Sequence, residues 1–261
     1  NILFNKIKNT KIFCIICLVS ILILILILLR YNYVEKYQDY NENNFNNTGM
    51  YVLYIPKREK YIKDIMNKLN FNPEHVKGPD KNKLNLEQLK KDGFISNKKI
   101  RDGIIACALG HHDILNKFLK TNKKYALIFE DDIFIPQEKN KQIEISTKIK
   151  NLINNIPIDA DIVYFGYCFE NCSKKYKYNE YFNKSVRPSC THLYFVSRKG
   201  ANKIINNIKP FKYGIDIHYM DLINNKILNS YSVNSNYLLI EQNRDNLGSE
   251  LDNDQKLRAC I

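Results

Sequence analysis

Residues 125–132 read YALIFEDD, an uninterrupted apolar and aromatic run followed at once by three carboxylates. A short, continuously apolar segment of this kind is typical of a strand buried on both faces of a parallel sheet. The chain leaves that strand at Glu130, and open parallel sheets bind their ligands at the carboxyl ends of the strands. The acidic turn therefore lies where a ligand site is expected.

Strand and helix patterns alternate on both sides of this stretch. Residues 50–55 (MYVLYI) form an expected strand stopped by Pro56, and apolar residues at helical spacing predict helices over 58–69 and 104–119. The later expected elements are a helix over 137–153, strands over 161–165 and 191–197, and a helix over 198–208. This alternation predicts an α/β fold with a mainly parallel sheet and helices on both faces.

The acidic turn itself, Glu130-Asp131-Asp132, suits a hard divalent cation. Adjacent carboxylates repel one another unless a cation or solvent compensates, and carboxylate oxygens are the ligands that Mg²⁺ and Mn²⁺ prefer. A solvated acidic turn is the alternative, and spacing alone leaves it open.

An apolar run precedes the domain. Residues 12–29 carry no charge, and as a helix they would extend ~27 Å, close to the ~30 Å of a bilayer core. A cleaved signal peptide is the competing interpretation, but Arg30-Tyr31 offers no small-residue cleavage site. We therefore expect an uncleaved transmembrane anchor. Lysines before the span place the amino terminus in the cytosol, as in a type II protein with a lumenal (ER/Golgi-like) or otherwise non-cytosolic domain. The expected divisions are a cytosolic tail (1–11), the anchor (12–29), a stem (30–48), the main domain (49–252) and a tail (253–261).

The formal charge of +13 does not predict a nucleic-acid partner. The basic residues are scattered among acids, without a Lys/Arg block, an RNA-binding aromatic motif or a zinc-finger spacing. A non-enzymatic basic protein that binds nucleic acid or anionic membranes remains a rival hypothesis, testable by steep salt dependence.

The cysteines are compatible with an oxidising compartment. Cys168, Cys172 and Cys190 are candidates for a bridge, with at least one thiol unpaired, and fully reduced cysteines are the alternative. Cys107 is interpreted as a small core residue. Gly110, in the middle of an expected helix, costs about 1 kcal/mol relative to Ala, which suggests close backbone packing there or a helix that ends early.

The segment 104–136 resembles glycosyltransferase family 25, which includes bacterial lipooligosaccharide galactosyltransferases and procollagen galactosyltransferases. That family shows G-C-x-L-S-H, a helix, and a strand ending in E-D-D; here the first motif reads ACALGH over Ala106 to His111, with Ala106 replacing Gly and Gly110 replacing Ser. Weaker likenesses lie before this segment, at 51–58, and after it, at 187–201, 213–221 and 240–251, in the same order as in the family.

The resemblance implies a GT-A-type nucleotide-diphospho-sugar transferase fold and an inverting transfer from a UDP-sugar with Mn²⁺ or Mg²⁺. In that family role Asp132 binds the diphosphate-bound cation, while Glu130 and the catalytic Asp131 orient the ribose or donor sugar and assist with the metal. His218 or His192 would complete the metal sphere, although a structural histidine is the alternative for each.

Three further roles depend on the resemblance. Asp216 is the candidate base for the acceptor hydroxyl, and a helix N-cap is its alternative. Lys57 and Arg58 are candidate donor contacts, and the alternative for both is a solvated surface position. His111 shares an apolar stripe with Leu115, so it is expected to point inward, either as a buried hydrogen-bonded histidine or as a donor contact.

We therefore expect a metal-dependent inverting glycosyltransferase that moves galactose or glucose from a UDP-sugar to a glycan, a lipid-linked glycan or a protein hydroxyl. A catalytically inactive relative that serves as a lumenal or surface binding protein is the alternative. The sequence specifies neither the sugar, the acceptor nor the oligomeric state.

Overall fold

A computed structural model of the chain describes residues 18–28, 30, 44–96, 100–238, 240–243, 247 and 260. The chain divides into two units, Asn1–Asn43 and Asn44–Ile261. In the first unit, residues 18–28 are helical and exposed. The expected anchor at 12–29 and stem at 30–48 fall partly outside the described residues, as does most of the tail at 253–261. Within the described part of the chain, no helix combines the length and the apolar character that a bilayer span requires.

The second unit is built on a seven-stranded sheet in the order β2-β1-β3-β7-β5-β8-β6. Its strands are β1 (Thr48–Tyr54), β2 (Glu74–Lys77), β3 (Tyr125–Glu130), β5 (Ile162–Cys168), β6 (Phe182–Lys184), β7 (Ser189–Ser197) and β8 (Ser230–Val233). β2, β1 and β3 are mutually parallel, as are β5 and β8, whereas β7 runs antiparallel between β3 and β5. The edge strand β6 is also reversed. The mainly parallel sheet is confirmed, with two reversed strands that hydrophobic patterns do not reveal.

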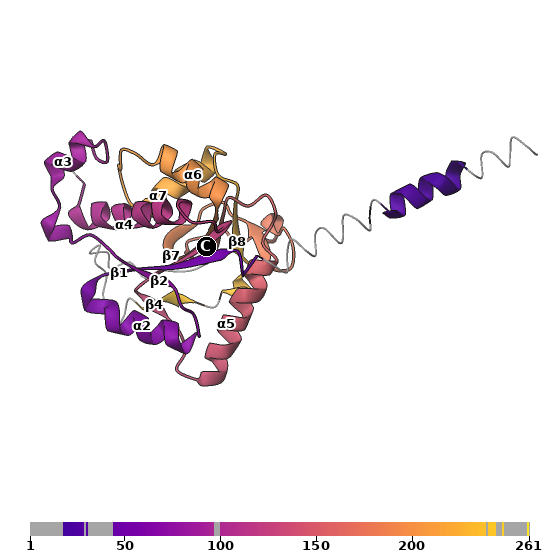
Figure 1. Cartoon of the computed structure of the whole chain (residues 1–261), viewed down its shortest axis with the longest axis horizontal. Helices are drawn as coiled ribbons and strands as arrows, with labels where there is room; N and C mark the ends of the chain where they lie inside the picture. Colours follow the sequence, from indigo (N-terminus) through magenta and orange to yellow (C-terminus); the bar gives the residue numbers. More distant parts are fainter. Residues whose placement is uncertain are drawn as a thin grey trace, which may run out of the picture. The chain divides into compact units, whose positions relative to one another are not determined.

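Helices cover both faces of this sheet (Figure 1), as the alternation predicted. One layer holds α4 (Asp102–Leu119), α6 (Arg198–Asn207) and α7 (Ile215–Asn224), which pack against one another, and the other holds α2 (Glu59–Lys68) and α5 (Lys139–Asn154). The short elements are α3 (Leu86–Lys91), the two-stranded β4 (Ile133–Phe134) with β9 (Glu241–Gln242), and the 3-10 turns η1 (Pro56–Arg58), η2 (Lys81–Lys83), η3 (Lys174–Tyr176) and η4 (Ser235–Tyr237).

Two glycines allow the helices of the first layer to lie close to the sheet. A Cβ at Gly110 of α4 would stand 2.6 Å from Cδ1 of Leu53 in β1, which confirms the expected close packing. A Cβ at Gly200 of α6 would stand 2.0 Å from the backbone oxygen of Asp161, just before β5. Backbone cannot yield as a side chain can, so α6 requires glycine at position 200.

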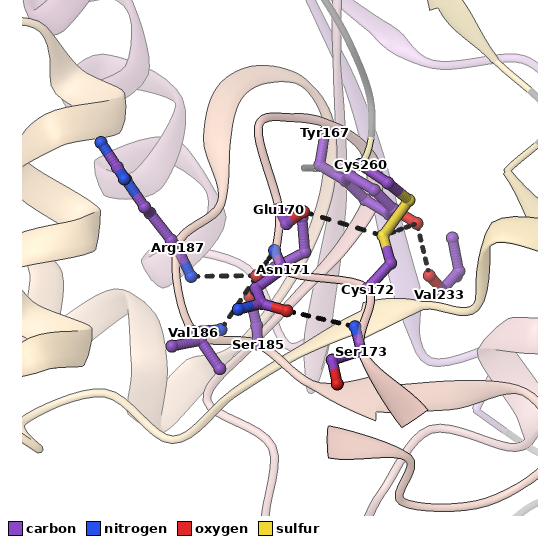
Figure 2. Close-up of a disulfide and its surroundings, with 10 residues drawn as sticks. All are labelled: Tyr167, Glu170, Asn171, Cys172, Ser173, Ser185, Val186, Arg187, Val233 and Cys260. Atoms are coloured by element: carbon purple, nitrogen blue, oxygen red, sulfur yellow. Dashed lines mark hydrogen bonds between the residues drawn. A yellow bond between two sulfur atoms is a disulfide. The ribbon is translucent and has the colours of Figure 1, made fainter. Parts of the chain in front are cut away.

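Two disulfides tie the loops at the carboxyl end of β5. Cys168–Cys190 joins the end of β5 to the start of β7, and both of its cysteines were among the three candidates for a bridge. Cys172 pairs with Cys260, a partner 88 residues away that spacing gave no reason to choose (Figure 2). Beside it, the fully buried Glu170 carboxylate accepts hydrogen bonds from the Ser185 hydroxyl and from the backbone N–H groups of 171, 186 and 187. Cys107 is the free thiol among the described residues.

Candidate active site

The acidic turn opens onto a cleft at the carboxyl edge of the sheet. Glu130 is the last residue of β3, Asp131 and Asp132 form the turn, and β4 begins at Ile133. All three carboxylate residues line a cavity of about 840 Å³, together with the end of β1 and the loop over residues 77–83. The turn lies where the sheet topology predicted.

A buried chain of hydrogen bonds ends on Glu130. Its Oε1 contacts Nε2 of His111 at 2.9 Å and accepts from the Thr191 hydroxyl at 2.5 Å. Nδ1 of His111 lies 3.0 Å from the hydroxyl of Tyr194, which lies 3.3 Å from that of Tyr219. In a neutral imidazole one nitrogen donates and the other accepts, so donation from Nε2 to Glu130 pairs with donation from Tyr194 to Nδ1. With this tautomer, the hydrogen bonds from Tyr194 to His111 and from His111 to Glu130 both run towards the Glu130 carboxylate.

This arrangement favours the ionised form of Glu130. Burial on its own would raise the pKa of Glu130, but the bonds from His111 and Thr191 outweigh burial and leave the pKa below its ordinary value. His111 is therefore a fully buried, hydrogen-bonded histidine that also orients a residue of the cleft wall. Thr191 was not predicted, because threonine is common in strands. The antiparallel direction of β7 brings the start of β7, where Thr191 lies, beside the end of β3.

Asp131 joins the acidic turn to the end of β1. Its Oδ2 accepts from the backbone N–H of Ile55 at 2.6 Å, and its Oδ1 accepts from Nη1 of Arg58 at 2.9 Å. Both side chains of this ion pair are buried, with 7% and 8% of their surface exposed. Burial raises the pKa of Asp131, and the bonds from Ile55 and Arg58 oppose that rise only in part. The solvated-surface alternative for Arg58 is therefore wrong, and Asp131 holds two chain segments together.

The segment around β9 supports Asp132 from the carboxyl-terminal side. Nε2 of Gln242 lies 3.3 Å from Oδ2 of Asp132, and the backbone N–H of Asn243 donates to the Asp132 carbonyl at 2.6 Å. Asn243 in turn donates to the hydroxyl of Tyr61 at 2.8 Å. Gln242 also lines the cleft. Its only sequence signal was the weak resemblance over 240–251.

Four lysines line the same cleft as the acidic turn. Lys57, Lys77, Lys81 and Lys83 all line the cavity. The backbone N–H of Asn82 donates to the Asp80 carboxylate at 3.0 Å, which caps η2 and shapes the loop that carries two of these lysines. Of these four lysines only Lys57 was predicted as a donor contact. In a chain with 40 Lys and Arg residues, the other three are recognised as cleft residues only when the fold brings them together.

Asp216 and His218 lie on α7 and are not among the residues that line this cleft. Asp216 is in the first turn, beyond the N-cap position at Gly214, and its Oδ2 accepts from the backbone N–H of Cys190 at 3.1 Å. Nε2 of His218 accepts from the backbone N–H of Lys212 at 3.0 Å. Burial, with a smaller contribution from the Lys212 charge, lowers the pKa of His218 to about 4. Nε2 of His192 lies 3.3 Å from the carbonyl oxygen of Ile240. His218 is therefore away from the acidic turn, whereas His192 lies on β7 next to Thr191, beside the end of β3, and its charge is one of the causes that lower the pKa of Glu130.

The acidic turn has the donor chemistry that a hard divalent cation requires. Mg²⁺ and Mn²⁺ at phosphate sites take one or two protein carboxylates, with substrate oxygens and water completing the shell. Both oxygens of Asp131 already accept hydrogen bonds, so Asp132 is the carboxylate suited to this role. His218 does not join it, because its Nε2 is used by Lys212.

Three comparisons place the chain among known proteins. The family model described as glycosyltransferase family 25 (LPS biosynthesis protein) matches residues 53–220, well over half of the chain. A putative glycosyltransferase of Haemophilus influenzae is 30% identical over 121 residues, which cover 45% of this chain and 41% of that relative. The chain therefore spans about two fifths of the curated relative that it matches.

A crystal structure of a glycosyltransferase involved in the glycosylation of the major capsid of PBCV-1 superposes with a TM-score of 0.38 at 9% identity, over 74% of this chain and 93% of the other. The family assignment depends on the family model, which extends from β1 through the acidic turn to α7. The chain belongs to glycosyltransferase family 25.

Proposed function

We propose that this protein is a glycosyltransferase that transfers a hexose, galactose or glucose, from a UDP-sugar to a hydroxyl of a glycan or protein in a single inverting displacement. The observation that carries the proposal is the cleft itself, which is lined both by the carboxylates of the acidic turn and by Lys57, Lys77, Lys81 and Lys83. A nucleoside diphosphate with a divalent cation presents both a positive centre and several negative oxygens. The two sets of charged side chains in the cleft match those two features.

Mn²⁺ or Mg²⁺, when bound, supplies positive charge that stabilises the diphosphate as it departs. Asp132 would hold the cation on the cleft wall, with Gln242 and Asn243 fixing the position of the turn. The lysines that line the cleft would bind the phosphate oxygens, and Glu130, kept ionised by His111 and Thr191, would orient hydroxyls of the donor. Asp131 maintains the turn through Ile55 and Arg58.

Asp216 remains our candidate for the base that accepts the proton of the acceptor hydroxyl. Its support is electrostatic: the Asp216 carboxylate is one of the charges that raise the pKa of Cys107, and Cys107 lines the cleft. The test is the pH profile of kcat/KM. At every pH of that profile, Asp216→Asn should lower kcat/KM by about 10²-fold or more relative to Asp113→Asn, and unchanged transfer would assign the base to another group.

The two disulfides support a non-cytosolic location for the domain. Disulfides form and persist in oxidising compartments. Together with the expected anchor at 12–29, they favour a type II protein whose catalytic domain is lumenal or otherwise outside the cytosol. Peptide mapping under non-reducing conditions of protein isolated from its native cells would test this, since reduced Cys172 and Cys260 would contradict it.

The decisive experiment measures turnover of UDP-galactose, UDP-glucose and UDP-N-acetylglucosamine by the full chain, with Mn²⁺, with Mg²⁺ and with chelator. We expect turnover that depends on the cation, and Asp132→Asn should lower kcat/KM by about 10²-fold or more, as loss of a group that stabilises developing charge does. Asp113→Asn, an exposed carboxylate on α4 outside the cleft, is the matched control. Full activity of Asp132→Asn would refute the assigned role, and an absence of turnover with every donor would favour the inactive relative.

A second arm examines the lysines of the cleft. Lys81→Gln should raise KM for the UDP-sugar several-fold, because a cation that contacts phosphate is lost. Lys91→Gln is its control, since Lys91 is exposed on α3 and does not line the cleft. Equal KM values for the two variants would remove the loop over 77–83 from the donor site.

A further inference from the structure

A second set of metal-ligating atoms adjoins the same cleft and is not the set assigned above. Cys107 and His111 are one turn apart on α4, so both project from the same face of the helix. Glu130 meets them from the end of β3. The Cys107 sulfur, a ring nitrogen of His111 and a carboxylate oxygen of Glu130 all lie within 4.8 Å of one another.

The ligands are held in place by their neighbours. The Tyr194 hydroxyl contacts Nδ1 of His111 and so turns Nε2 towards Glu130, while the Thr191 hydroxyl fixes the Glu130 carboxylate. Metal-binding histidines almost always have their second nitrogen held in this way. A tyrosine hydroxyl both donates and accepts, so Tyr194 can also accept from Nδ1–H when Nε2 carries its lone pair towards a cation.

The site has an entrance and a favourable field. Cys107 and Glu130 both line the cleft of about 840 Å³, so a cation can enter from solvent and keep an open coordination position. Burial and then the carboxylates of Glu130, Asp216, Asp132 and Asp131 raise the pKa of the Cys107 thiol well above its ordinary value. The same negative field that disfavours a lone thiolate favours a dication.

The mixture of ligand atoms selects the kind of metal. Thiolate and imidazole suit Zn²⁺ and its relatives, whereas Mg²⁺ and Mn²⁺ prefer oxygen alone. We propose that Cys107, His111 and Glu130 form a binding site for a thiophilic divalent cation such as Zn²⁺, separate from the Mn²⁺ or Mg²⁺ position at Asp132. On binding, the Cys107 thiol releases its proton to solvent, and the His111 proton resides on Nδ1, so the imidazole stays neutral.

Binding at this site would oppose catalysis. The cation replaces the hydrogen bond between His111 and Glu130 and engages the carboxylate assigned to the donor. Zn²⁺ should therefore inhibit a reaction that Mn²⁺ supports. This consequence depends on the proposed function, whereas the binding itself does not.

Co²⁺ is the spectroscopic probe for the binding arm, because a cobalt–thiolate bond gives a charge-transfer band that oxygen and nitrogen ligands do not give. The full chain, with Cys14→Ser and Cys17→Ser to remove the other thiols and with its disulfides intact, should develop this band and lose it when Zn²⁺ is added. Cys107→Ser should abolish the band and weaken Zn²⁺ binding by about 100-fold or more, since even the loss of an outer-shell partner costs 10–100-fold. His112→Asn is the matched control, because His112 lies next in α4 but contacts Phe94 and Asn116 instead.

A second measurement needs no substitution at the site. Zn²⁺ should slow alkylation of Cys107 in the same protein, followed by mass spectrometry, whereas Mg²⁺ should not. Absence of the cobalt band, or alkylation at an unchanged rate in excess Zn²⁺, would overturn the proposal.

The ratio of UDP-sugar turnover with and without Zn²⁺ then tests inhibition, and Cys107→Ser should bring that ratio close to one. Zinc binding without any turnover would leave this site intact and refute the proposed function instead, so the two failures are distinguishable.

Discussion

Asp131→Asn should destabilise the domain as well as impair the reaction. The substitution removes the negative charge that faces the buried Arg58 guanidinium at 2.9 Å, and an amide cannot accept at both positions now bonded to Ile55 and Arg58. Removing one partner of a buried ion pair costs about 3–5 kcal/mol. Because burial raises the pKa of Asp131, its ionised form is itself penalised, and we expect a value near the lower end, about 3 kcal/mol.

The assay is thermal and urea unfolding of the full chain. In a domain of this size 1 kcal/mol shifts Tm by about 2–4 °C, so Asp131→Asn should lower Tm by about 6–12 °C. Asp113→Asn, on the exposed side of α4, should leave Tm unchanged. The partner variant Arg58→Met removes the opposite charge, and the double variant should be more stable than the sum of the single effects by about 2 kcal/mol or more.

The reasoning would be refuted by an Asp131→Asn protein with the parental Tm, or by strictly additive effects of the two substitutions. The outcome also governs how activity data are interpreted. Asp132→Asn should lose transfer at nearly normal Tm, whereas loss of transfer in Asp131→Asn would combine a missing carboxylate with a displaced turn.

Three further predictions concern stability. The pKa of His218 falls from 6.5 to about 4 on folding, so between those pH values the unfolded chain binds a proton that the native protein does not. The free energy of unfolding should therefore fall by roughly 2–3 kcal/mol as the pH is lowered through that window. In urea unfolding of His218→Gln, this contribution to the pH dependence of stability should be absent. Gly200→Ala should cost more than about 2 kcal/mol in denaturant unfolding, because the new Cβ meets a carbonyl oxygen at 2.0 Å, whereas Gly78→Ala, with its nearest contacts at 3.5 Å, should be far milder. Replacing Cys172 and Cys260 together with serine should lower stability by about 2–4 kcal/mol; a Tm equal to that of the parent protein would show that the bridge does not constrain the unfolded chain.

The four strands β1, β3, β5 and β7 could be predicted because local composition marks them, whereas the short strands β2, β6 and β8 were not expected. The run Tyr125–Phe129 is fully buried as its uniform apolar character implied, and Gly110 packs as closely as its position in a helix suggested. The direction of β7 could not be predicted, because the same apolar pattern occurs in parallel and in antiparallel strands. That direction depends on the order of strands in the finished sheet.

The candidate site was predictable in its acidic half and, through the resemblance, at Lys57 and Arg58. Glu130, Asp131 and Asp132 form a cluster in the sequence itself, and the resemblance named His111. Lys81, Gln242 and similar cleft residues come from distant segments whose composition is unremarkable for this chain. His218 was proposed as a metal ligand because imidazole suits that role, but the backbone N–H of Lys212 occupies its Nε2.

The position of β9 bears on how the protein is made. The strand that pairs with β4 and the amide groups that fix Asp132 emerge from the ribosome more than a hundred residues after the acidic turn. Until then β4, with the apolar Ile133, lacks its partner strand. Chaperones that recognise apolar surface have a defined target during that interval, and an early stop codon just before residue 240 should yield a sheet without a working cleft.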